Sequence, residues 1–349
     1  MSDGTARLAL RRPADESAAP PEPLPYRLDV HVATSGAREA MAADVRAGLT
    51  ARPKWLLPKY FYDGTGCDLF EAITLLPEYY QTRTELALLR AEAPGIVARH
   101  GPTELLELGS GSSHKTRALL DAMREDGGLR RYRPFDISPG ALLAAAGRLA
   151  EDYAGLRVAA VAGDFERHLG RIPPPPRRGR RLVAFLGSTI GNLHPDGREP
   201  FLRSVRTLLR PDDRLLLGTD LVGDRARLEA AYNDASGVTA AFNLNVLSVL
   251  NAELDGDLDL SRFEHVAFFD DENEWIEMRL RALEDHSARL RALDLDVSFS
   301  AGEEIRTELS CKFTRASVER MYADADLELV EWRTDPNGWY AVSLAAPAP

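Results

Sequence analysis

Between residues 104 and 220, short apolar runs alternate with stretches whose apolar residues recur at helical spacing. The apolar runs are TELLELG, YRPFDIS, LRVAAVAGDF, RLVAFLG and DRLLLGTDL, and we expect each of them to form a strand. The stretches between them include KTRALLDAMRED, ALLAAAGRLAEDY and PFLRSVRTLL, which are expected to form helices. Alternating strands and helices are typical of βαβ units, so the pattern predicts a parallel, doubly wound sheet in an α/β fold.

The end of the chain has a different pattern. SVERMYADA predicts a helix, LELVEWRT a strand, DPNG a turn and WYAVSLAA a last strand. A closing hairpin after five parallel strands gives a Rossmann-like, seven-stranded sheet. Residues 222–310 separate these two parts with a long mixed pattern. We therefore interpret them as a second domain that is inserted into the sheet.

The segment before the sheet combines a helical pattern with an aromatic stretch that has no regular period. Residues 36–52 have the apolar spacing of a helix, which Pro53 ends. The following text, KWLLPKYFYDGTGCDLF, is aromatic and not periodic, and we expect a folded loop that is either a lid or an aromatic extension of the core. The expected organisation is a disordered tail (1–25), an N-terminal helix and lid that pack on the second domain (26–84), a cofactor-binding core (85–221), the inserted domain (222–310) and a final helix and hairpin (311–349).

The segment RIPPPPRRGRR, residues 171–181, combines four prolines with five arginines. We interpret it as a solvated polyproline connection, with a basic phosphate-binding patch as the alternative.

Composition favours a small-molecule substrate. The formal net charge is −11 and the pI is about 5.3, which argues against nucleic acid or an anionic membrane as a partner. Cys67 and Cys311 are the only cysteines, so the chain lacks a disulfide framework and a cysteine metal cluster. We find neither a signal-peptide pattern nor an apolar run long enough to span a bilayer. We expect a cytoplasmic protein that acts as a monomer.

The sharpest local signal is ELGSGSSHKT, residues 107–116, which lies between an expected strand and an expected helix. Gly109 and Gly111 allow a tight turn and a close approach to a ligand. Asp136 ends the next strand, where a carboxylate would accept ribose hydroxyls. Asp164 and Phe165 end the strand after that and would hold an adenine. Three strand ends in this order indicate a nucleoside-containing cofactor.

Three other interpretations of the glycine loop remain open. GSGSSHKT is similar to a phosphate-binding P-loop, although His114 replaces the glycine that should precede Lys115. A dinucleotide site would have a third glycine at the position of His114. The third interpretation is that the glycines serve only as structural turns.

With FLGSTIGN, residues 185–192, a wider resemblance is evident. Residues 53–343 resemble the histidine Nα-methyltransferases of the ergothioneine pathway, through KWLLPKYFYDGTG, LPEYYQTRTE, ELGSGSSHKT, FLGSTIGN, AYNDASGVTAAFNLNVL, IEM and IRTELSCKF. The resemblance implies a two-domain class I methyltransferase that uses S-adenosylmethionine (SAM) and no metal, with residues 222–310 as the inserted substrate-binding domain. It also implies three successive methyl transfers to the α-amino nitrogen of L-histidine, which give hercynine.

The resemblance also implies roles for individual residues. Those matching cofactor positions are Gly109, Lys115, Asp136, Asp164 and Phe165; those matching substrate positions are Tyr79, Asn192, Tyr232, Met278, Glu308 and Ser310; those matching the amine site are Tyr62, Gly187 and Asn192.

Glu308 and Ser310 also have a rationale of their own. They are two residues apart, so on a strand both side chains point to one face. A carboxylate and a hydroxyl can serve the N–H and the bare nitrogen of a neutral imidazole. The alternative is that Glu308 pairs with Arg306 on a solvated strand. Two other functions stay open: methylation of another amino acid, such as a tryptophan derivative, and a SAM-binding protein without activity.

Overall fold

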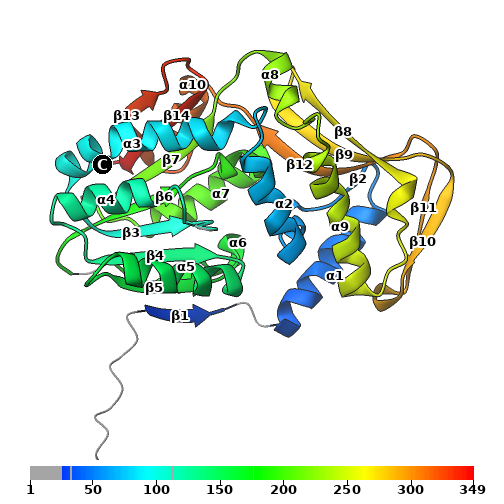
Figure 1. Cartoon of the computed structure of the whole chain (residues 1–349), viewed down its shortest axis with the longest axis horizontal. Helices are drawn as coiled ribbons and strands as arrows, with labels where there is room; N and C mark the ends of the chain where they lie inside the picture. Colours follow the sequence, from blue (N-terminus) through cyan, green and yellow to red (C-terminus); the bar gives the residue numbers. More distant parts are fainter. Residues whose placement is uncertain (1–25, 32–33, 112, 176) are drawn as a thin grey trace, which may run out of the picture.

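The computed structural model describes residues 26–31, 34–111, 113–175 and 177–349. Its largest element is a sheet of eight strands in the order β1-β5-β4-β3-β6-β7-β14-β13 (Figure 1). The first six strands are parallel, and β14 and β13 are antiparallel to their neighbours. The strands are β1 (Tyr26–Val30), β3 (Pro102–Leu108), β4 (Arg131–Asp136), β5 (Arg157–Ala162), β6 (Arg180–Phe185), β7 (Arg214–Asp220), β13 (Leu327–Thr334) and β14 (Tyr340–Pro347).

The α/β class, the five parallel strands of the alternating region and the closing hairpin are confirmed. The predicted number of seven strands is wrong, because β1 adds an eighth at the edge, where Tyr26 lies opposite Val158 of β5. This strand has only five residues and lies far from the rest of the sheet in the sequence. Its pattern is too short to be distinguished from a connecting segment.

Helices cover both faces of this sheet, which explains why its strands are apolar throughout. Leu105 of β3 is buried with Leu89 and Leu120 on one face, whereas the next residue, Leu106, is buried with Val205 on the other. The first face is covered by α3 (Tyr80–His100), α4 (Arg117–Glu125) and α5 (Pro139–Asp152), and the second by α7 (Pro195–Arg206) and α10 (Arg315–Asp324). The carboxyl ends of the parallel strands point toward the part of the molecule that lies on the right of Figure 1.

Most of the remaining elements form what we call the second lobe, on the right of Figure 1. A four-stranded sheet in the order β2-β12-β9-β8 and the hairpin β10-β11 surround α9. The elements are α1 (Thr34–Thr50), β2 (Lys54–Trp55), η1 (Pro58–Phe61), α2 (Gly64–Thr74), α8 (Arg225–Ala230), α9 (Val238–Leu254), β8 (Phe263–Asp270), β9 (Trp275–Ala282), β10 (His286–Leu290), β11 (Leu295–Phe299) and β12 (Glu304–Cys311).

The segment predicted as a folded loop is more regular than expected, since it contains β2, η1 and α2. Asp63 begins α2 by accepting hydrogen bonds from the backbone N of Gly66 at 2.7 Å and from the amide of Asn245 at 2.8 Å. A Cβ at Gly66 would lie 1.7 Å from the carbonyl oxygen of Phe61, so only glycine fits there. These contacts fix α2 against α9, and they depend on residues that the local pattern does not reveal.

The proline- and arginine-rich segment is also only partly as predicted. Its arginines at 171, 177, 178 and 180 are exposed. Arg181, however, is buried at the start of β6, where its guanidinium binds the carboxylate of Glu104 at 2.6 Å. The prediction of a solvated connection is therefore wrong for its last residue, which belongs to the sheet.

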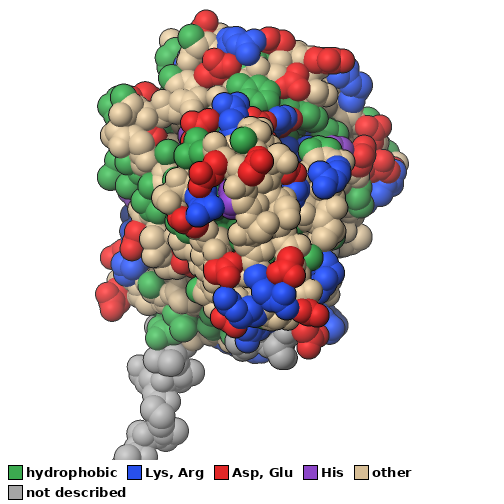
Figure 2. All heavy atoms as spheres, turned by 90° about the vertical axis from the view of Figure 1, so that its right-hand side faces the viewer, with side chains coloured by type: hydrophobic (Ala, Val, Ile, Leu, Met, Phe, Trp, Pro, Cys, Tyr) green, Lys and Arg blue, Asp and Glu red, His purple; other side chains and the backbone are tan. Residues whose placement is uncertain are grey.

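The predicted tail, residues 1–25, lies outside the described residues. Among the residues that are described, no helix is both long and apolar enough to cross a membrane. On the outer face of the second lobe, acidic and basic side chains are interspersed (Figure 2).

Candidate active site

The glycine loop after β3 has the geometry expected of a ligand-binding turn. Gly109 and Gly111 have φ of +67° and +47°, a conformation that favours glycine, and a Cβ on either would meet nothing within 4 Å. The backbone N of Gly111 donates to a carboxylate oxygen of Asp136 at 2.9 Å, and the N of Gly109 donates to the carbonyl of Phe135 at 2.8 Å. The loop is thus joined directly to the end of β4 and has open space on its other side.

Asp136 is held by the backbone rather than by a cation. Its second carboxylate oxygen accepts a hydrogen bond from the backbone N of Ser138 at 3.0 Å. Burial raises the pKa of the Asp136 carboxyl, although these backbone N–H groups oppose the rise. Each oxygen still has a lone pair for a further donor, so the carboxylate can accept two hydroxyl groups.

Asp164 and Phe165 lie after β5, at the start of the short helix α6 (Phe165–His168). The Asp164 carboxylate lies 3.7 Å from the ammonium of Lys59, which belongs to η1 of the second lobe. The Phe165 ring packs edge-on against Phe185 and Phe201, with centroids 5.8 and 5.5 Å apart. The segment is therefore next to the second lobe.

Lys115 and Gly187 are brought together by Glu85, a residue that the sequence did not single out. Glu85 lies on α3 and is completely buried. Its carboxylate accepts hydrogen bonds from the Lys115 ammonium, from the backbone N of Gly187 at 2.8 Å and from the Tyr340 hydroxyl at 2.7 Å. A charged residue on an amphipathic helix usually faces solvent, so only the QTRTE part of the family motif pointed to Glu85.

Asn192 ends η3 (Thr189–Asn192), the turn that follows β6. This turn packs directly on β12, because a Cβ at Gly191 would lie only 2.8 Å from the carbonyl oxygen of Cys311. Asn192 is half-buried, and its side-chain amide has no hydrogen bond to any described residue. The amide is thus placed at the junction of the main sheet and the second lobe with its donors and acceptor available.

Three predicted tyrosines come from different elements. Tyr79 and Tyr232 meet edge-on with their ring centroids 6.3 Å apart. Tyr62 packs edge-on against Phe70 and Phe242, each at 5.7 Å. Burial, and then the nearby Glu308 charge, raise the pKa of Tyr62 well above its ordinary value. The Tyr62 hydroxyl therefore keeps its proton at neutral pH.

Glu308 and Ser310 point to the same face of β12, as predicted, and Met278 lies opposite Glu308 on β9. Glu308 is 8% exposed and has no hydrogen bond or ion pair with any described residue, so the pairing with Arg306 is not present. Burial raises the pKa of its carboxyl to about 7, with the Lys312 charge opposing the rise. A buried carboxylate costs free energy unless a partner satisfies it, which indicates a ligand with an N–H donor.

Lys312 and Asp220 are the other polar residues that the sequence interpretation missed. Both side chains are completely buried and form an ion pair at 2.8 Å. Lys312 also donates to Ser310 and to the hydroxyl of Tyr232. The alternation in IRTELSCKF places Lys312 on the same face as Glu308 and Ser310, and this was the signal that could have identified it.

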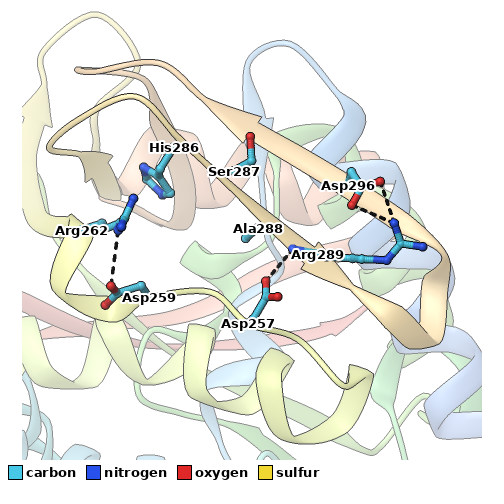
Figure 3. Close-up of a pocket in the computed structure, with 8 residues that line it drawn as sticks. All are labelled: Asp257, Asp259, Arg262, His286, Ser287, Ala288, Arg289 and Asp296. Atoms are coloured by element: carbon cyan, nitrogen blue, oxygen red, sulfur yellow. Dashed lines mark hydrogen bonds and ion pairs between the residues drawn. The ribbon is translucent and has the colours of Figure 1, made fainter.

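A surface hollow of about 470 Å³ lies elsewhere, on the outer side of the second lobe (Figure 3). It is lined by Asp257, Asp259, Arg262, His286, Ser287, Ala288, Arg289 and Asp296, and it contains no predicted site residue. Its charges pair with one another: Arg289 binds Asp296 at 2.9 Å and Arg262 lies 3.4 Å from Asp259. Within the described part of the chain, no group of three or more His, Cys, Asp or Glu residues is arranged to hold a metal ion.

Comparison with known proteins agrees with this geometry. Residues 41–347 match the family described as "Histidine-specific methyltransferase, SAM-dependent". The chain is 55% identical to a histidine N-alpha-methyltransferase of Mycolicibacterium smegmatis over 90% of its length and 97% of that protein. It is 50% identical to the protein of the same name from Mycobacterium tuberculosis, over 90% and 98% of the two chains. An "Ergothioneine biosynthesis protein 1" of Neurospora crassa is 29% identical over 80% of this chain and 32% of that protein. The chain therefore belongs to the histidine-specific, SAM-dependent methyltransferase family.

Proposed function

We propose that this protein transfers three methyl groups in succession from SAM to the α-amino nitrogen of L-histidine, which gives hercynine. The names of the two mycobacterial relatives support this substrate, and the name of the Neurospora relative supports a place in ergothioneine biosynthesis. The observation that carries the proposal is Glu308, a buried carboxylate without a partner among the described residues, beside the hydroxyl of Ser310.

The residues at the strand ends fit SAM, which supplies an electrophilic methyl group when bound. The open side of Gly109 leaves room for the cofactor, and the backbone-held carboxylate of Asp136 suits the two ribose hydroxyls. Asp164 and Phe165 would hold the adenine. Lys115 would act at the cofactor while Glu85 compensates its charge, and the same carboxylate fixes Gly187.

The chain must also present a neutral amine. An α-ammonium has a pKa of roughly 8 in peptides and more in a free amino acid, so it has to lose a proton. Removal from water favours the neutral form, and Asn192 with the Gly187 carbonyl would orient its lone pair. Tyr62 is not a general base, because its raised pKa keeps its hydroxyl protonated. Its ring face would stabilise the final trimethylammonium cation by roughly 0.5–2 kcal/mol.

The opposite end of histidine would be recognised on β12. Glu308 accepts the imidazole N–H, Ser310 serves the other ring nitrogen, and Met278 packs beside the ring. Tyr79 and Tyr232 are placed to bind the α-carboxylate through their hydroxyls.

The test is selectivity. We expect Glu308→Ala to lower kcat/KM for histidine by about 10- to 150-fold, the equivalent of roughly 1.5–3 kcal/mol for a lost hydrogen bond to a charged group. Phenylalanine and tryptophan, measured on the same proteins, should be affected little or should improve, because the carboxylate that penalises apolar rings is gone. A parallel loss for all three amino acids would mean that Glu308 supports the fold, and the histidine assignment would lose its physical basis.

We also propose that the protein acts as a cytoplasmic monomer, without metal, nucleic acid or membrane as a partner. The net charge of −11 and the presence of only two cysteines support this. Light scattering of the purified protein, with and without cofactor, tests the oligomeric state.

A further inference from the structure

Lys312 has an unusual environment for a lysine. It directly follows β12, and its side chain is completely buried. The ammonium lies 2.8 Å from a carboxylate oxygen of Asp220, 2.9 Å from the hydroxyl oxygen of Ser310 and 3.1 Å from that of Tyr232. An ammonium group has three donors and no acceptor. All three donors are therefore used within the protein, so Lys312 has none left for a substrate.

The two hydroxyl groups are also bonded to each other, with 2.7 Å between the oxygens of Ser310 and Tyr232. Lys312 can only donate, so both oxygens accept from it. Each hydroxyl keeps one proton, and one of these two protons is used in the bond between them. The Gln81 side chain also interacts with the Tyr232 hydroxyl, but as a donor, so it takes up neither proton, and the other proton is left to face a ligand. Without the ammonium, either hydroxyl could turn its proton inward, and this donor would no longer be fixed.

Asp220 holds the ammonium in place. It ends β7 of the main sheet, and its carboxylate also accepts a hydrogen bond from the Tyr80 hydroxyl at 2.6 Å. Its backbone N donates to the Ser188 hydroxyl at 3.0 Å, in the turn that precedes Asn192. The ion pair between Asp220 and Lys312 therefore joins the end of the main sheet to the strand of the second lobe that carries Glu308.

We propose that Lys312 is a positioning residue for the amino-acid substrate: anchored by Asp220, it fixes the hydroxyls of Ser310 and Tyr232 so that one proton faces the substrate. The inference rests on the proposed function, in which Ser310 serves the imidazole and Tyr232 the carboxylate; because only one proton of the bonded pair faces the substrate, only one of these two hydroxyls donates to it at a time. A lysine with a purely structural role would need only its ion pair with Asp220. The hydrogen bonds from Lys312 to the hydroxyls of Ser310 and Tyr232 are what indicate a positioning role.

The charge of Lys312 acts on Glu308 as well. Burial raises the pKa of the Glu308 carboxyl, and Lys312 is the charge that opposes the rise. The other titratable groups that interact with Glu308 are the hydroxyls of Tyr62, Tyr79 and Tyr232, which stay neutral because burial raises the pKa of each. Loss of the Lys312 charge should therefore move the ionisation of Glu308 to higher pH.

The experiment compares Lys312→Met with Lys54→Met, a matched control. Lys54 is also a buried lysine bound to a carboxylate, that of Glu303, and it lies on β2 of the same four-stranded sheet. We expect Lys312→Met to raise the histidine KM by about 10-fold or more, with little change in kcat or in the affinity for S-adenosylhomocysteine measured by calorimetry. The pH below which KM rises should move upward. Lys54→Met should leave KM and the pH profile unchanged.

Two further variants separate positioning from a structural effect. In a Ser310→Ala/Tyr232→Phe background, at a pH well above the ionisation of Glu308, Lys312→Met should change KM by less than about twofold, because the hydroxyl groups that Lys312 positions are absent and Glu308 stays charged. Asp220→Asn/Lys312→Met removes both charges, avoids a lone buried carboxylate and should show the same rise in KM as Lys312→Met.

Three results would overturn the inference while leaving the proposed function intact: a folded Lys312→Met with the KM of the wild type, a folded double variant with that KM, or an equal effect of Lys312→Met in both backgrounds. If the wild-type protein itself does not methylate histidine, the proposed function is wrong, and the inference that depends on it is overturned with it. The wild-type measurement thus separates the two failures.

Discussion

Replacing Glu308 by glutamine should stabilise the folded protein and weaken its activity at the same time. The side chain is buried and lacks a partner among the described residues, so its charge opposes folding until a ligand binds. Glutamine keeps the shape of the side chain but removes the charge. A residue with a structural role would behave in the opposite way, because its removal would cost stability.

The size of the effect follows from the pKa of Glu308, which burial raises from 4.5 to about 7. A group whose pKa is raised on folding destabilises the folded state as the pH increases, because the folded state holds a proton that the unfolded state has released. The penalty is small below pH 4.5, grows between pH 4.5 and 7, and is complete above pH 7. At 1.36 kcal/mol per pKa unit it reaches about 3 kcal/mol, or about 4 °C in Tm for a chain of this length.

Thermal unfolding at pH 8 and pH 5 measures this directly. Glu308→Gln should raise Tm at pH 8 and have little effect at pH 5. Glu304→Gln on the same strand is the control. Burial opposes ionisation of Glu304, but hydrogen bonds from Arg279 and Arg281 outweigh it and lower the pKa of the carboxyl. That variant should lose stability at pH 8. A loss of stability in Glu308→Gln at pH 8 would refute the reasoning, since it would mean that the carboxylate has a favourable partner within the protein.

Three other predictions follow from the site. Asp136→Ala should weaken the binding of S-adenosylhomocysteine, measured by calorimetry, by roughly 1.5–3 kcal/mol, and an unchanged affinity would remove Asp136 from the site. ATP with Mg²⁺ should not bind the wild-type protein, and tight ATP binding would favour a P-loop. Asn192→Ala should reduce turnover far more than cofactor affinity, and near-normal turnover would show that the amide is only structural. Gly191→Ala should impair turnover, because its Cβ would lie 2.8 Å from the Cys311 carbonyl oxygen, while Gly197→Ala, which meets nothing within 4 Å, should not; equal activities would mean that the turn can shift freely.

The sequence predicted the main sheet well because its evidence is local. Each strand of the alternating region is a continuous apolar run, and each helix has its own periodicity, so β3 and α4 are evident without knowledge of the fold. The strand β1 was missed because five residues at a sheet edge do not form a distinctive pattern. The helix α2 was missed because it depends on Asp63 and on its contact with Asn245, a residue far away in the chain.

The polar residues of the site also could be predicted only where the local sequence pattern identifies them. Glu308 and Ser310 could be paired from their spacing, because a strand places alternate residues on one face. Glu85 and Asp220 could not be identified from the local pattern, since nothing local distinguishes a buried charge from a solvated one, and only the family motif pointed to Glu85. Their partners, Lys115 and Lys312, come from other segments, so these ion pairs are evident only in the folded chain.

The most direct test of the central claim is mass spectrometry of a reaction that contains the protein, SAM and the twenty common amino acids in one pool. Our account predicts that histidine alone gains mass, that the final product carries three methyl groups, and that fragmentation places all three on the α-nitrogen. Methylation of another amino acid, methylation of the imidazole ring or the absence of any methylated product would contradict it.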